Sequence, residues 1–104
     1  MIYKVKAKYK PEKLLAFFKN LTDGSIAKQK PDGTEIVESM KRAKITESET
    51  IEWFEMCFCP TPLQHERTTV YDHFLEDIST YTAENYEEVE GDSFWDYMNA
   101  QFVS

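Results

Sequence analysis

The segment Ile51–Cys59 constrains the fold of this chain more than any other. Its nine residues are densely apolar and aromatic, which argues against a surface helix and favours a central β-strand. Successive side chains of a strand point to opposite faces of the sheet. Here both faces carry apolar side chains: Ile51, Trp53, Cys57 and Cys59 on one, and Phe54, Met56 and Phe58 on the other. Helices can cover only one of these faces, so the sequence predicts that another layer covers the second.

A strand and a helix are predicted at the N-terminus. Residues 2–9 alternate between apolar side chains and lysines, which is the periodicity of a strand. Pro11 then suits the first turn of a helix, and the apolar stripe that follows is broken at Asp23 and Gly24. We therefore expect a strand over residues 2–9 and a helix from Pro11 to about residue 22.

The stretch Thr34–Ile45 is compatible with a strand or with a short helix. In a helix, Glu38 and Arg42 would pair four residues apart. We favour a strand, which a polar hairpin loop over Thr46–Thr50 would join to the central strand.

A second helix is predicted from a capping signal. Thr61, Pro62 and Gln64 match a capping box, in which side chains satisfy the free backbone donors of the first turn. The apolar stripe that follows predicts a helix to about residue 80. It consists of Leu63, Val70, Tyr71, Phe74, Ile78 and Tyr81.

The C-terminal part is predicted to add one strand and one helix. Tyr86–Glu90 is a candidate for a short acidic strand. Ser93 and Asp96 form a second capping signal, which starts a short helix over residues 93–103.

These elements follow the order strand, helix, strand, strand, helix, strand over residues 1 to about 90, and the helix at 93–103 docks onto this core. We interpret residues 1–104 as a single α+β domain. The order predicts a ferredoxin-like βαββαβ arrangement with an antiparallel sheet, in which the first strand lies between the third and the fourth.

This element order resembles the dimeric α+β-barrel group of small proteins, which contains cofactor-independent monooxygenases, muconolactone-type isomerases and members without known activity. The resemblance implies a homodimer whose sheets pack face to face, and this would cover the second apolar face of Ile51–Cys59. It rests on element order and on no sequence motif, so it assigns no functional residue.

Positive and negative charges are separated along the chain. Eleven of the twelve Lys and Arg residues lie in residues 1–44, and Arg67 is the only base in residues 45–104, beside fourteen acids. Because these acids would compete with phosphate for any lysine cluster, we expect no binding of nucleic acid.

We expect the lysines of residues 2–9 to be neutralised by acids on the neighbouring strands. Opposite charges on adjacent strands each contribute about 0.2–1 kcal/mol. The candidate partners are Glu52 or Glu55 on one side and Glu87, Glu88 or Glu90 on the other.

The expected location is the cytoplasm. The first residues alternate in polarity, unlike the continuous apolar region of a signal peptide, and no apolar run approaches the length of about 20 residues that spans a bilayer. The two cysteines are then expected to be free thiols in a reducing compartment, and no contact with a membrane is expected.

Cys57 and Cys59 are weak candidates for a metal site. They lie on one face of the predicted strand, and His65 and His73 follow, which gives four potential ligands within seventeen residues. The two imidazoles, however, would lie on different edges of the predicted helix and would not converge. We therefore favour buried structural thiols, and we expect no metal or other cofactor.

Two further groups could form a functional site. Glu66, His73 and Asp77 share one border of the second predicted helix, where Asp77 could hold His73 as a general base. A pair on the surface of the helix is the simpler reading.

Arg67 falls inside the apolar stripe of the same helix, and strand periodicity points Glu55 into the same layer. A charge placed there must be paired or must line a cavity, so we expect Arg67 to meet Glu55. An Arg67 side chain that extends to solvent along its aliphatic stem is the alternative. Glu55, Arg67, Trp53 and Glu66 are the predicted residues of a ligand cleft.

These observations favour a homodimeric small-molecule-binding or accessory protein. Two alternatives stay open: a small cofactor-independent enzyme that uses His73 and Asp77, and a metal-binding protein that uses thiols and histidine. Gly-rich phosphate loops are excluded, because the chain has only three glycines and no such motif.

Overall fold

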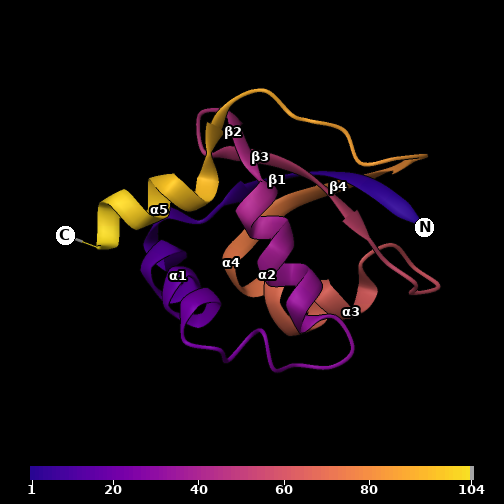
Figure 1. The fold of residues 1–104 in the computed structure, drawn as a ribbon, viewed down its shortest axis with the longest axis horizontal. Helices are drawn as coiled ribbons and strands as arrows, with labels where there is room; N and C mark the ends of the chain where they lie inside the picture. Colours follow the sequence, from indigo (N-terminus) through magenta and orange to yellow (C-terminus); the bar gives the residue numbers. More distant parts are fainter. Residues whose placement is uncertain (104) are drawn as a thin grey trace.

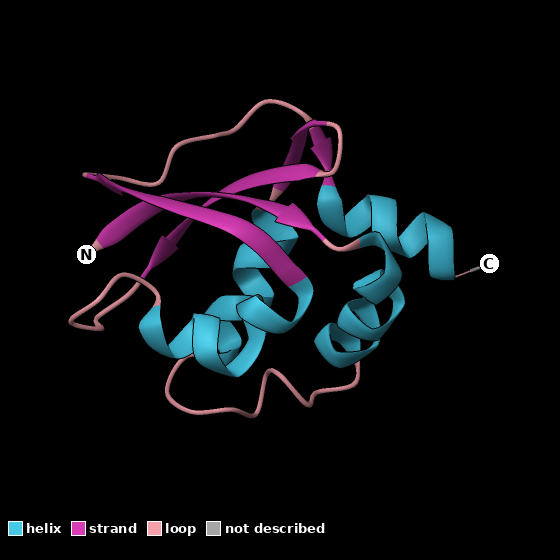
Figure 2. Ribbon diagram, turned by 180° about the vertical axis from the view of Figure 1, so that it is seen from behind, coloured by secondary structure: helices cyan, strands magenta, loops and turns pink. Residues whose placement is uncertain are grey.

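A computed structural model describes residues 1–103, and it has an antiparallel sheet with helices packed against one of its faces (Figures 1 and 2). The strands are β1 (Ile2–Tyr9), β2 (Lys44–Glu47), β3 (Thr50–Met56), β4 (Leu75–Ala83) and β5 (Asp92–Ser93). The α-helices are α1 (Leu14–Thr22), α2 (Gly33–Arg42), α3 (Gln64–Glu66), α4 (Asp72–Phe74) and α5 (Phe94–Phe102). A 3₁₀ turn, Pro11–Lys13, precedes α1, and a π-helical turn, Arg67–Tyr71, joins α3 to α4. The predicted α+β class is confirmed.

The order of the strands in the sheet is β4-β1-β3-β2-β5. β1 lies between β4 and β3 and pairs antiparallel with both. Along the chain, two helices, α1 and α2, separate β1 from β2, and β5 and α5 follow β4. The chain therefore has more elements than the predicted order. Among the described residues, no helix is long and apolar enough to cross a membrane.

The alternation of β1 separates a buried face from a charged one. Tyr3, Val5, Ala7 and Tyr9 are buried against the helices. The lysines on the other face pair with acids of three different strands: Lys4 with Glu52 at 3.5 Å, Lys6 with Glu47 at 3.1 Å and Lys8 with Asp77 at 4.0 Å. The predicted role of Glu52 is thus confirmed. Glu55 lies instead on the buried face, and the acids of residues 87–90 lie outside β4.

The prediction of a strand over Thr34–Ile45 was wrong, because residues 33–42 form helix α2. Ile36, Ser39 and Met40 are buried at the three- and four-residue spacing of a helix. Arg42 pairs with Glu35 at 3.1 Å, whereas Glu38 pairs with Lys41 at 3.4 Å. β2 begins at Lys44, so the expected loop over 46–50 shortens to a turn at residues 48–49.

The second predicted helix was wrong at both ends. The observed helix begins at Gln64, after Leu63, which has the left-handed conformation (φ 56°). No side chain caps this helix, and Thr61 contributes only its carbonyl oxygen, which lies 3.0 Å from the Gln64 amide. The helix ends at Phe74, because residues 75–83 pair with the whole length of β1 as β4. Alternating β-branched residues favour this strand, and sheet pairing outweighs the helical periodicity. Ile78 and Tyr81 therefore belong to β4.

Residues 84–91, here called the strap, run from the end of β4 to β5 at the opposite edge of the sheet (Figure 1). The predicted strand at 86–90 was wrong, since the strap has no strand pairing. The strap lines a hollow together with Lys4 and Phe54, and Phe54 is only 5% exposed. The chain itself therefore covers part of the second apolar face of β3, whereas Phe58, beyond the strand, is 87% exposed.

The C-terminal helix formed as its capping signal predicted. The Ser93 side chain accepts a hydrogen bond from the Asp96 amide at 3.1 Å. Phe94 stacks on Tyr9 with ring centroids 5.5 Å apart, and Trp95 meets Phe18 edge-on at 5.8 Å. α5 therefore joins the helical layer beside α1 and α2 (Figure 2).

Candidate functional site

A pocket of about 350 Å³ lies between the start of α2, the end of β3 and α3. Its lining combines carboxyl groups, thiols and apolar side chains: Pro31, Asp32, Glu35, Met56, Cys57, Phe58, Cys59 and Glu66. We call it the thiol–carboxylate pocket. No Lys or Arg is among these residues.

Glu66 brings the two cysteines together. The chain continues past β3 so that Cys57 and Cys59 lie beside α3, where the Cys59 amide donates to Cys57 Sγ at 3.2 Å. Both thiols donate to the same oxygen, Glu66 Oε1, at 3.7 Å from Cys57 Sγ and 3.5 Å from Cys59 Sγ. Glu66 and Cys57 are buried, and Cys59 is half-buried.

A second group of polar side chains lies on the other side of Glu66. His65 Nδ1 is 2.8 Å from Asp32 Oδ2, while Asp32 Oδ1 is buried without a hydrogen-bond partner. Potential ligand atoms of Asp32, His65 and Glu66 all lie within 4.8 Å of one another, and the same holds for Cys57, Cys59 and Glu66. Glu66 therefore belongs to two overlapping sets of metal-ligating groups.

Burial favours the neutral forms of Glu66 and Cys57. Desolvation raises the pKa of Glu66, and the nearby Asp32 carboxyl raises it further. Burial also raises the pKa of the Cys57 thiol to about 12. Since the thiolate is the nucleophilic form of cysteine, these surroundings disfavour a reactive Cys57.

Glu55 lies behind the pocket as a fully buried carboxyl group. Its Oε1 accepts hydrogen bonds from Trp53 Nε1 at 2.8 Å and from the Tyr71 hydroxyl at 2.6 Å, whereas its Oε2 has no partner. Burial raises the pKa of Glu55 to about 8. The hydrogen bonds from Tyr71 and Trp53 lower this pKa, and the nearby carboxyl groups of Glu66 and Glu35 raise it. Glu55 is therefore largely protonated at neutral pH.

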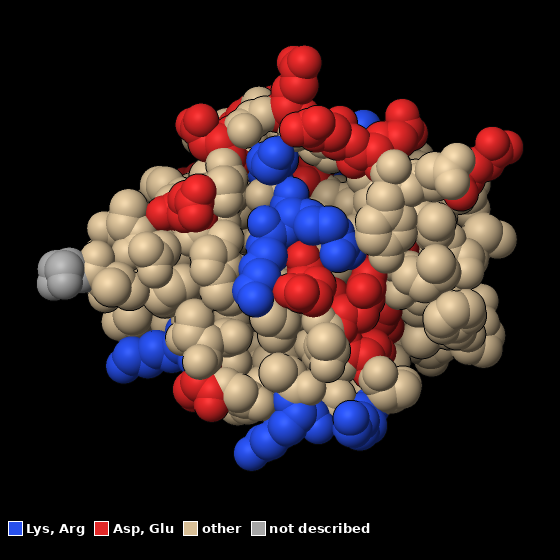
Figure 3. All heavy atoms as spheres, in the orientation of Figure 1, with Lys and Arg blue, Asp and Glu red and all other residues tan. Residues whose placement is uncertain are grey.

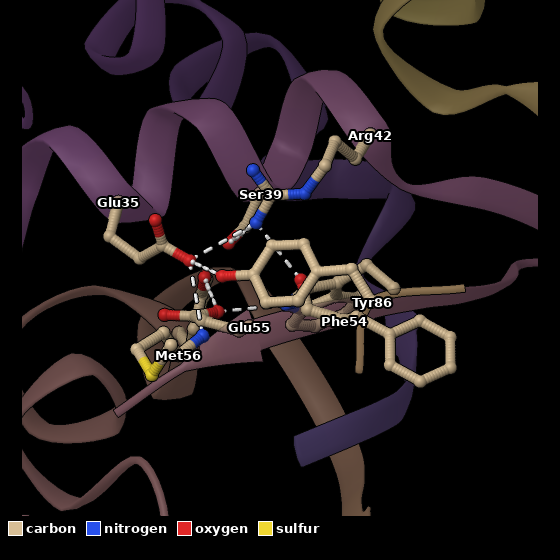
Figure 4. A network of polar contacts seen from close by, with 9 residues as sticks. Glu35, Ser39, Arg42, Phe54, Glu55, Met56 and Tyr86 are labelled. Atoms are coloured by element: carbon tan, nitrogen blue, oxygen red, sulfur yellow. Dashed lines mark hydrogen bonds and ion pairs between the residues drawn. The ribbon is translucent and has the colours of Figure 1, made fainter. Parts of the chain in front are cut away.

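Glu35 connects the pocket to the strap. Its Oε2 accepts hydrogen bonds from Arg42 at 3.1 Å, from the Tyr86 hydroxyl at 2.8 Å and from the Met56 amide at 3.1 Å (Figure 4). Arg42 also stacks over the Tyr86 ring at 4.6 Å and donates to the Phe54 carbonyl oxygen at 2.9 Å. Basic and acidic side chains consequently lie side by side on this face of the molecule (Figure 3).

The expected pair of Arg67 and Glu55 was wrong. Arg67 Nε donates to Asp72 Oδ1 at 3.2 Å, and its side chain is 42% exposed. The π-helical turn changes the number of residues per turn, so a stripe drawn at 3.6 residues misplaces Arg67. The expectation that Glu55 points into the interior was nevertheless confirmed, with Trp53 and Tyr71 as its neighbours.

His73 and Asp77 are not brought together. Their pairing depended on one helix, but His73 lies in α4 and Asp77 lies in β4, where it pairs with Lys8. His73 lines a separate hollow with Lys13 and Thr69.

Sequence reasoning missed Asp32 and Glu35. Asp32 precedes the strand that was expected over Thr34–Ile45, and such a strand would not have directed Glu35 to the pocket. A sequence analysis that had predicted a helix over residues 33–42 would have placed both carboxyl groups at the start of that helix.

Comparison with known protein families, with curated proteins and with solved structures gave no match. The function is therefore argued from the geometry of the site.

Proposed function

We propose that this protein is a binding or accessory protein whose thiol–carboxylate pocket holds a cationic ligand. The observation that carries the proposal is the lining of the pocket, which contains Asp32, Glu35 and Glu66 and no Lys or Arg. Of these acids, only Glu35 has a permanent cation beside it, Arg42, among the ion pairs of residues 1–103. A bound cation favours the ionised form of a nearby acid, so a partly enclosed pocket lined by these acids is suited to a positively charged ligand.

The rest of the lining restricts the kind of cation. Pro31, Met56 and Phe58 add apolar surface beside the carboxyl groups, and Phe58 stands largely exposed at the pocket. Thiols are soft ligands that small hard cations such as Mg²⁺ avoid. The pocket is therefore suited to an organic cation with an apolar part or to a metal ion of softer character.

The enzyme alternative has less support. Its expected base, His73 held by Asp77, depended on a contact that the fold does not make. The raised pKa of Cys57 also disfavours a thiolate nucleophile in the pocket. The lining of the pocket therefore supports a binding function.

The proposal includes a ferredoxin-like fold and a homodimer. The run β4-β1-β3-β2 within the sheet supports the fold, and the exposed Phe58 supports an interface near the end of β3. Light scattering tests the dimer: a mass near twice 12.3 kDa at micromolar concentration is expected, and the mass of one chain would contradict it.

A thermal-shift screen tests the pocket. The panel contains divalent metal salts, primary amines and guanidinium compounds, with carboxylates and phosphates as oppositely charged controls. A cation present at 100 times its Kd should stabilise the native protein by about 2.7 kcal/mol. Glu66→Gln should abolish this shift, whereas Glu52→Gln, on the opposite face of the sheet, should retain it. Stabilisation by anions alone, or a shift that survives in Glu66→Gln, would contradict the proposal.

A further inference from the structure

We propose that Cys57, Cys59 and Glu66 form a binding site for a divalent cation of zinc-like, borderline-soft character. This inference rests on the proposed function and names the class of cation. It reverses the expectation from the sequence, where the thiols had no converging histidine. The structure supplies the convergence through Glu66 instead.

The spacing of the ligand atoms fits tetrahedral coordination. A Zn–S bond of about 2.3 Å and a Zn–O bond of about 2.0 Å at a tetrahedral angle separate sulfur from oxygen by about 3.5 Å. The two Sγ atoms lie 3.7 Å and 3.5 Å from Glu66 Oε1. An ion could therefore enter between the three atoms with little movement of the chain.

The surroundings of the three ligands support a built site. The backbone amide of Cys59 donates to Cys57 Sγ, which is the type of hydrogen bond that stabilises a bound thiolate. Asp32 lies on the other side of Glu66, with a buried Oδ1 that has no partner and an Oδ2 held by His65. Asp32 thus belongs to the neighbouring set of ligands with His65 and Glu66, and His65 fixes its orientation beside the three proposed ligands.

Binding changes the protonation of the ligands and leaves their oxidation state unchanged. Each sulfur coordinates as a thiolate, so each Sγ–H proton leaves to solvent when the metal–sulfur bond forms. Glu66 coordinates as a carboxylate, and a proton held by it is released in the same way. No electron is transferred.

Cobalt provides the direct test, because Co²⁺ occupies zinc-like sites and shows a thiolate charge-transfer absorption. The chelator-treated protein is titrated with Co²⁺ and then with Zn²⁺. We expect one Co²⁺ per chain with a thiolate absorption band, and displacement of the cobalt by Zn²⁺. Cys57→Ser, Cys59→Ser and Glu66→Gln should each weaken binding by about tenfold or more. His73→Ala, outside the pocket, is the matched control and should bind as the unmodified chain does.

The second cysteine variant separates a loss of metal binding from a failure to fold. If Cys57→Ser fails to fold because its thiol is buried, the half-buried Cys59→Ser decides, with circular dichroism as the check of its fold. Absence of the thiolate band, or unchanged affinity in Cys59→Ser, would overturn the metal site. If amines stabilise the chain in a Glu66-dependent way while Co²⁺ and Zn²⁺ do not, the cation pocket stands and the metal inference fails. If none of these cations binds, both fail.

Discussion

The effect of the substitution Glu55→Gln on stability should change sign with pH. The variant should be slightly less stable than the unmodified chain at low pH and more stable at high pH. The folded-state pKa of Glu55 is about 8, against an ordinary value of 4.5. Between these two values, the folded chain holds a proton that the unfolded chain has released. Stability falls with pH wherever the folded state binds more protons. The contribution of Glu55 is therefore fully present below about pH 4.5 and is lost progressively as the pH rises to about 8.

The size of this effect follows from the interval between the two pKa values. Each tenfold change in proton affinity corresponds to about 1.4 kcal/mol, so the complete loss is about 5 kcal/mol. Gln cannot ionise, and its oxygen can accept the same hydrogen bonds from Trp53 and Tyr71. Its amide group takes the place of Oε2, which has no partner, at a cost of about 1–2 kcal/mol. Glu55→Gln should thus be slightly destabilising at pH 5 and stabilising by about 3 kcal/mol near pH 8.

Urea denaturation followed by tryptophan fluorescence measures this crossover, since Trp53 is fully buried beside Glu55. The titrations are run at pH 5, 6.5 and 8 with a chelator present, so that metal binding does not contribute. Glu52→Gln, which removes the partner of Lys4 on the outer face, is the control and should cost less than about 1 kcal/mol at every pH. A difference between Glu55→Gln and the unmodified chain that does not change with pH would refute the assignment of a protonated, buried Glu55.

Three further substitutions test the fold around the site. Tyr86→Phe removes the hydroxyl that donates to Glu35, so it should cost about 0.5–1.5 kcal/mol and increase hydrogen exchange in the strap; unchanged exchange at residues 84–91 would show that this contact does not hold it. Gly33→Ala places a Cβ against the backbone carbonyl of Ile26, so α2 must shift, and urea titrations should show a loss of stability of about 1–3 kcal/mol. Gly24→Ala is the comparison for backbone strain without a clash, because its Cβ would meet no atom although its φ is 91°. Ser93→Ala removes the cap of α5 and should lower stability by about 1 kcal/mol, whereas Ser93→Thr, which keeps a hydroxyl, should recover most of that loss.

Local patterns predicted the elements whose form depends on their own residues. The alternation of residues 2–9 predicted β1, because one face of that strand is buried and the other is solvated. Ser93 and Asp96 predicted the start of α5, because an N-cap hydrogen bond joins residues only three apart.

Tertiary contacts decided the elements that sequence analysis predicted wrongly. Residues 75–83 carry a helical stripe, but β1 needs a second partner strand, and pairing along its length outweighs that stripe. In the same way, the thiols of Cys57 and Cys59 were placed on one face by strand periodicity, while their partner Glu66 depended on where α3 begins. The contribution of Asp32 and Glu35 depended on α2 being a helix. The residues of the site could thus be predicted in part, but their convergence could not.

The contacts of Arg42 and Glu35 with β3 bear on how the sheet avoids uncontrolled addition of a further strand. β2 pairs with β3 only as far as Glu52, so the remainder of that edge of β3 has no neighbouring strand. A bare strand edge is a template on which another polypeptide can add by hydrogen bonding, and this leads to aggregation. Here the Phe54 carbonyl and the Met56 amide are occupied by the side chains of Arg42 and Glu35. Two charged side chains from a helix thereby close the sheet edge against strand addition, without a further strand.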